Sequence, residues 1–173
     1  MDKLAQLRSQ LASLRAGETP EVEIYTVIHG FGNERFTEAK PYIEQQLGHP
    51  DPQIRYIALN VLAIHWMCTE HRQTCEHFAL TDLDSDNRRL GISGLGALLE
   101  GTRDPKVLQL LLHVFNDEQE EPHVRDRAYS SILYVLGKPA KAQPSATRRL
   151  NYAEDVNWEW IGEASDIAKT APR

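Results

Sequence analysis

The chain has 173 residues, a formal net charge of −6 and a sequence pI of about 5.6. This acidic balance excludes general nucleic-acid binding, which requires a basic face to neutralise phosphates. The two cysteines, Cys68 and Cys75, are too few for a disulfide framework, and no apolar run approaches the ~18 residues of a membrane span. We therefore expect a soluble, cytoplasmic chain without membrane contact, whose partner is a protein, and a basic one if the charge has a role.

The first half of the sequence predicts helices separated by glycine and proline. The leucine spacing up to Gly17 forms one apolar face, and Pro20 marks the start of the next helix. Two glycines and an asparagine within 29–33 predict a break, because these residues favour positive φ. Pro41 predicts a kink or a late helix start, because proline removes a backbone donor. The expected helices cover about 1–17, 21–28, 36–47 and 53–66.

The second half continues in the same manner. A polar helix is expected over about 70–80, and the helix after Asp84 carries glycines that require close approach of a neighbouring backbone. Pro105 opens the most apolar helix of the chain. An acidic loop over 116–121 then separates it from a helix that ends at Gly137.

One phrase occurs three times: a turn, an arginine, a small residue three places on, and an apolar residue four places after that. Its arginines are Arg55, Arg88 and Arg125, which lie 33 and 37 residues apart. A period of this length is typical of helical solenoids, in which helical hairpins pack on their neighbours. The sequence therefore predicts an all-α fold, a right-handed α-solenoid of about four helical hairpins. The solenoid should cover 1–137, followed by a linker over 138–147 and a C-terminal capping helix and tail over 148–173 in the same domain.

The turn aspartate, the arginine after an apolar residue, the small residue and the spaced leucine resemble a HEAT-like repeat, of the kind found in bacterial phycobilin-lyase-type proteins. The resemblance covers about 20–137 and implies the solenoid fold, although such folds serve many unrelated partners. It also implies an internal ladder, in which each arginine pairs with a loop aspartate of the adjoining unit. The arginines would be Arg55, Arg88 and Arg125, and the acceptors Asp51, Asp84 or Asp86, and Asp117.

Two clusters of metal-ligand residue types have the wrong spacing for a metal site. The histidines and cysteines of 65–77 suit zinc, but an expected turn near Cys68 breaks the face that they would share. The alternating aspartates of 82–86 suggest a calcium loop, but Arg88 stands where such a loop needs glycine and Ser93 where it needs glutamate. No nucleophile elbow, phosphate loop or H-E-x-x-H motif occurs. We therefore predict no metal, no cofactor and a non-enzymatic function.

The leading hypothesis is a protein-binding module that uses the concave face of the solenoid and an acidic loop edge, with an immunity or inhibitor protein and an adaptor as specific forms. Loops that join the two helices of each unit emerge along one edge of a solenoid, so their carboxylates should steer a basic partner. The alternative is a lyase or chaperone-like subunit of the phycobilin-lyase type, which rests on the resemblance alone. The predicted partner-binding residues are Tyr56, Asn60, Arg89, Asp126 and Tyr129 on the second helices, and Asp117, Glu118, Glu120 and Glu121 in the loops.

Overall fold

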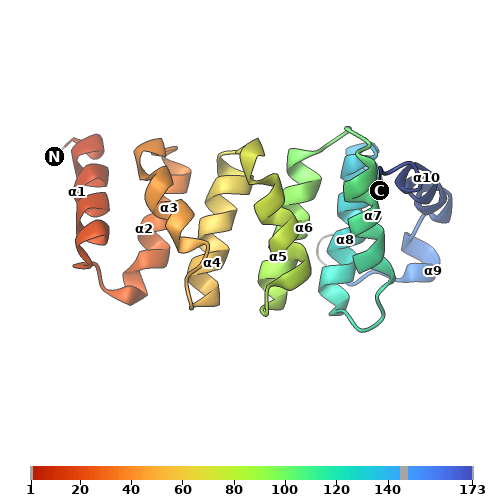
Figure 1. Ribbon diagram of the computed structural model, residues 1–173, viewed down its shortest axis with the longest axis horizontal. Helices are drawn as coiled ribbons and strands as arrows, with labels where there is room; N and C mark the ends of the chain where they lie inside the picture. The colour runs from red at the N-terminus through yellow and green to blue at the C-terminus, as the bar shows by residue number, and fades with distance from the viewer. Residues whose placement is uncertain (1, 145–147, 173) are drawn as a thin grey trace. The chain divides into compact units, whose positions relative to one another are not determined.

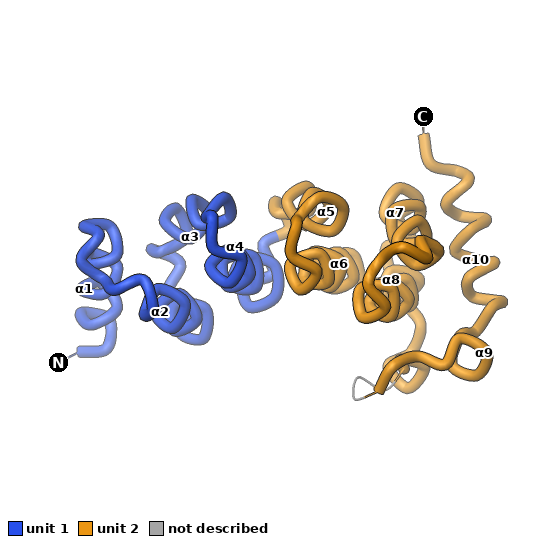
Figure 2. Tube along the Cα trace, turned by 90° about the horizontal axis from the view of Figure 1, so that it is seen from below, with its two compact units in different colours: residues 1–68 blue, residues 69–173 orange. Residues whose placement is uncertain are grey.

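The computed structural model describes residues 2–144 and 148–172, and all the regular structure in those ranges is helical (Figure 1). This confirms the all-α fold class that the sequence predicts. The chain divides into two compact units, Met1–Cys68 and Thr69–Arg173 (Figure 2). Residues 145–147 of the predicted linker lie outside the described ranges, and the domain bounds inferred from the repeats stay a prediction.

The helix ends of unit 1 follow local chemistry. Its elements are α1 (Lys3–Ala16), α2 (Glu21–Asn33), the 3₁₀ turn η1 (Thr37–Ala39), α3 (Lys40–Gln46), α4 (Pro52–Leu59) and the π-helical segment η2 (Asn60–His65). Gly17 closes α1 in the left-handed conformation, with φ of 70°. The Asp51 carboxylate caps α4 by accepting the N–H of Gln53 at 2.8 Å. Pro41 lies in the first turn of α3, so the predicted late start is confirmed.

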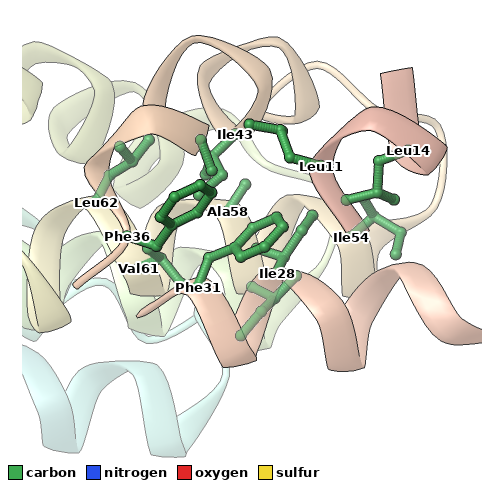
Figure 3. Packing of buried hydrophobic residues seen from close by; sticks show 12 residues of the cluster. Leu11, Leu14, Ile28, Phe31, Phe36, Ile43, Ile54, Ala58, Val61 and Leu62 are labelled. Atoms are coloured by element: carbon green, nitrogen blue, oxygen red, sulfur yellow. The ribbon is translucent and has the colours of Figure 1, made fainter. Parts of the chain in front are cut away.

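The core of unit 1 is an apolar cluster between its helices (Figure 3). Each fully buried aliphatic or aromatic side chain stabilises the fold by about 1.5–3 kcal/mol. The rings of Phe31 and Phe36 pack together with their centroids 5.3 Å apart. The labelled members of the cluster are Leu11, Leu14, Ile28, Phe31, Phe36, Ile43, Ile54, Ala58, Val61 and Leu62.

The break predicted within 29–33 is wrong, because α2 continues to Asn33. Gly32 is buried, and a β-carbon at this position would lie 2.7 Å from a methyl group of Val61 and 3.3 Å from the His65 ring. The Gly32 carbonyl also accepts a hydrogen bond from the Trp66 indole at 3.3 Å. The glycine therefore serves close packing, and tertiary contacts outweigh its weak helix propensity.

Unit 2 stacks its helices on one another. Its elements are η3 (Thr69–His71), α5 (Arg72–Thr81), α6 (Ser85–Leu98), α7 (Pro105–Asn116), α8 (Pro122–Val135), η4 (Ala140–Ala142), α9 (Tyr152–Asp155) and α10 (Trp158–Ala168). Helix α6 packs against α5 and α8, and α10 packs against α7, as neighbours do in an α-solenoid (Figure 2). The predicted C-terminal capping helix is therefore confirmed as α10, which buries Ile161, Ala164 and Ala168. The right-handed course of the stack stays a prediction.

Glycines allow α6 to approach its neighbours closely. A β-carbon at Gly91 would lie 2.6 Å from the backbone nitrogen of Ala79 and 2.7 Å from the carbonyl oxygen of Cys75. A β-carbon at Gly96 would lie 2.7 Å from the hydroxyl oxygen of Ser131. These distances confirm the packing reason that the sequence predicts for glycines in this helix.

Candidate protein-binding site

Two loops of unit 2, between α5 and α6 and between α7 and α8, lie at the same end of their helices (Figure 1). The acidic side chains exposed there are Asp86, Asp117, Glu118 and Glu121, which we call the acidic edge. Leu83, in the first of these loops, is 96% exposed. The edge therefore combines several exposed carboxylates with one exposed apolar side chain.

Arg88 joins the two loops through Glu120. Its Nε and Nη2 donate to the two carboxylate oxygens at 2.8 and 2.7 Å, and the two side chains are only 19% and 12% exposed. Its Nη1 also donates to the carbonyls of Asp82 and Leu83, at 3.0 and 3.3 Å. Burial is the largest single effect and raises the pKa of the Glu120 carboxyl, but the hydrogen bonds from Arg88 and from the Glu121 N–H, together with the charge of Arg88, hold the pKa below its ordinary value of 4.5. Glu120 is therefore held inside the edge, which corrects the prediction that it faces a partner.

The repeated arginine has the same backbone role in two of the repeats. Arg55 donates through Nη1 to the carbonyls of residues 49 and 50, both at 2.9 Å, which lie six and five positions before it. Arg88 donates to the carbonyls at the same two offsets. Arg125, after a longer loop, donates through Nε to the carbonyl of Phe115 at 3.1 Å. The arginine therefore fixes the turn before its own helix, a role that the sequence analysis missed.

The aspartates expected as ladder acceptors bind groups close to them in sequence. Asp84 caps α6 by accepting the N–H of Asn87 at 3.0 Å, as Asp51 caps α4. Asp117 accepts the N–H of Gln119 at 2.9 Å, and Asp86 pairs with Arg89 at 3.1 Å. The carboxylate of the adjoining hairpin that pairs with Arg88 is therefore Glu120 rather than any of these aspartates.

The partner-binding residues predicted on the second helices differ in their exposure. Tyr56, Asn60 and Arg89 are each partly exposed on their helices. Tyr129 is only 1% exposed, and its hydroxyl accepts the N–H of Asn157 at 2.9 Å and donates to the Asp155 carbonyl at 3.3 Å. The prediction that Tyr129 faces a partner is therefore wrong, because the C-terminal segment covers it.

The same segment also covers Asp126, which was expected to face a partner. Its carboxylate, 17% exposed, accepts hydrogen bonds from Arg149 at 2.9 Å and from the hydroxyl of Tyr152 at 3.3 Å. The Tyr152 ring stacks on Phe115 with centroids 5.6 Å apart and lies 5.1 Å below the guanidinium of Arg125. Asp126 therefore anchors the C-terminal segment on α8.

The described part of the chain holds no group of three or more histidine, cysteine or carboxylate side chains placed to bind a metal ion.

Burial raises the pKa of the Cys75 thiol to about 12, so this cysteine stays protonated and unreactive at neutral pH. Within the same residues, no helix has both the length and the apolar character needed to cross a membrane.

Comparison with known proteins supports the repeat architecture. No family model matches the chain, and neither does any solved structure. The 26S proteasome non-ATPase regulatory subunit 1 homologs A and B of Arabidopsis thaliana are each 33% identical to it over 102 residues. The match covers 56% of this chain but only 9% of each relative's length. The repeated arginine turns, the stacked helices and this similarity together define a helical-repeat protein.

Proposed function

We propose that the chain is a protein-binding helical-repeat module that contacts a basic partner through the acidic edge of unit 2. The observation that carries the proposal is the exposure of Asp86, Asp117, Glu118 and Glu121 at the same end of unit 2 as Leu83, which is 96% exposed. An apolar contact surrounded by charged residues matches the usual anatomy of protein interfaces. The Arg88–Glu120 pair keeps the two loops together, so the edge is organised before a partner arrives.

The similarity to proteasome regulatory subunits supports a binding role, because those relatives are by name parts of a multiprotein assembly. Immunity, inhibitor and adaptor roles are specific forms of the proposal. Affinity capture of the tagged protein from its host, followed by identification of the bound protein, would distinguish among them. The lyase alternative has no observation in its favour beyond the resemblance in the repeats.

The test neutralises the edge without disturbing its support. A triple variant, Asp117→Asn, Glu118→Gln and Glu121→Gln, removes three exposed charges and leaves Glu120 on Arg88. A control, Glu18→Gln, Glu21→Gln and Glu23→Gln, changes the net charge equally at exposed positions of unit 1. Both variants are compared with the wild type in stopped-flow association with the captured partner.

We expect the edge variant to lower the association rate several-fold at low salt, while the control leaves the rate almost unchanged. The difference should shrink at physiological ionic strength, where the Debye length falls from about 30 Å to about 8 Å. If the edge variant associates at the wild-type rate with the same salt dependence, recognition lies on another surface.

A further inference from the structure

A groove with a volume of about 510 Å³ lies beside α8. Arg89 of α6 and Arg127 and Tyr134 of α8 line it. Gln143 and Arg149, from the segment between α8 and α9, line it as well. This volume falls within the ~300–1,000 Å³ that is usual for pockets that bind small molecules or single peptide side chains.

The lining of the groove is basic, although the chain as a whole is acidic. Among the described residues that line it are four arginines and a single carboxylate, that of Asp126. Ion pairs hold three of the guanidiniums around the groove: Arg89 with Asp86, Arg148 with Asp155, and Arg149 with Asp126. Each arginine has five N–H donors in a planar fork, so a paired guanidinium keeps donors for a second anion.

Two polar side chains in the wall have unused hydrogen-bonding capacity. Among the residues that the structure describes, neither the buried amide oxygen nor the buried amide nitrogen of Gln143 has a hydrogen-bond partner. The Nε2 of His123 is also buried without one, because its nearest carboxylate oxygen, on Asp86, is 3.8 Å away. A buried polar group without a hydrogen bond is unfavourable, so a polar ligand that bonded to these atoms would be stabilised by this wall.

We propose that this groove binds the carboxylate or phosphoryl group of an acidic protein segment. Planar guanidinium groups bind both anions in a bidentate manner, and the amide of Gln143 can contribute neutral donors. The inference goes beyond the proposed function, since it concerns a ligand of the opposite charge and a groove whose lining holds none of the acidic-edge carboxylates, although Asp86 of the edge pairs with Arg89 of the groove. The triple variant of the edge leaves Asp86 in place, so the edge and the groove can be tested separately.

The test measures fluorescence anisotropy of labelled hexaglutamate, of the same peptide with phosphoserine in place of one glutamate, and of hexaglutamine. The wild-type protein should bind both acidic peptides with salt-sensitive affinity, and should not bind hexaglutamine. Tighter binding of the phosphoserine peptide assigns the site to phosphoryl groups, and equal or weaker binding assigns it to carboxylates. Absence of binding to both acidic peptides at low salt would overturn the proposal.

Two variants locate the binding. The double change Arg89→Gln and Arg127→Gln should weaken binding of the acidic peptides by about tenfold or more, because it removes two cationic hydrogen-bond donors. The control, Arg8→Gln and Arg15→Gln, removes the same charge from exposed positions of unit 1, where Arg8 also holds an ion pair, with Glu38. Equal weakening by this control would overturn the proposal, because it would show attraction by net charge alone.

Two further variants distinguish binding in the groove from effects on folding and from binding at the acidic edge. Gln143→Ala should weaken peptide binding several-fold without changing the charge or lowering the thermal unfolding temperature, and wild-type affinity in this variant would count against the groove as the binding site. The acidic-edge triple variant should keep wild-type or slightly tighter affinity for hexaglutamate. Loss of binding in that variant would place the peptide on the edge instead of in the groove.

Discussion

Arg88→Ala is the substitution that best tests how unit 2 is held together. The guanidinium makes two charged hydrogen bonds to Glu120 and two further bonds to the carbonyls of Asp82 and Leu83. Alanine removes all four and leaves the Glu120 carboxylate, 12% exposed, without its cation. Within the described ranges, the N–H of Glu121, at 2.7 Å, is the donor that it keeps. The two loops would then lose the contact that joins them.

The expected cost follows from the burial of the pair. Breaking a fully buried ion pair costs about 3–5 kcal/mol, whereas an exposed pair is worth about 0–1 kcal/mol. The side chains of Arg88 and Glu120 are 19% and 12% exposed, which places the pair between these limits. We therefore expect Arg88→Ala to lower the free energy of unfolding by about 2–3 kcal/mol. The neighbouring Arg89→Ala breaks a pair whose side chains are 34% and 63% exposed, and should cost less than about 1 kcal/mol.

Urea unfolding followed by far-ultraviolet circular dichroism measures both variants. The pH dependence has a definite sign, because the pKa of Glu120 is lowered in the folded state. The contribution of the pair is fully present above the ordinary value of 4.5 and is lost as pH falls through the folded pKa. The difference between wild type and Arg88→Ala should therefore narrow in acid. If Arg88→Ala costs no more than Arg89→Ala at neutral pH, Arg88 does not support the fold in this way.

Three further predictions concern unit 2. Gly91→Ala should lower the free energy of unfolding by about 1–3 kcal/mol, because the added methyl group would meet backbone atoms. Gly162 has open space around it, so Gly162→Ala should raise the free energy of unfolding by about 0.5–1 kcal/mol in the same urea assay. A destabilisation of equal size at both positions would contradict the packing argument. Tyr129→Phe should speed limited proteolysis of the C-terminal segment, because the N–H of Asn157 loses its acceptor; wild-type cleavage rates would show that this bond does not hold the segment. Cys75 should react with a thiol reagent only after unfolding, and rapid labelling of this residue in the native protein at neutral pH would contradict its raised pKa.

The glycines show which helix ends can be predicted from the local sequence and which cannot. Gly17 and Gly137 end helices in the left-handed conformation, as expected from glycine after an apolar face. Gly32 is also a glycine, but it lies inside α2, because Val61 and His65 pack against it. Glycine marks both a helix end and a close approach, and only the packing partner distinguishes the two.

The C-terminal segment shows why the candidate site was only partly predictable. Tyr129 and Asp126 occupy repeat positions that face outward in a solenoid, so the repeat pattern predicted partner contacts for them. Residues 23 to 28 positions later in the chain cover both side chains. The aromatic residues Tyr152 and Trp158, which both contact Phe115, were the signal in the sequence that this segment would dock.

The sequence by itself determined the helical-repeat architecture, the repeated arginine phrase and the acidic loops. These features depend on residues within one or two helical turns of one another, where spacing along the chain is also spacing in the fold. Only the tertiary structure decided that Arg88 pairs with Glu120, 32 residues away, and that four arginines line one groove. Such contacts depend on how whole helices pack. Several carboxylates in the sequence could pair with a given arginine, and only the packing decides which one lies close enough to do so.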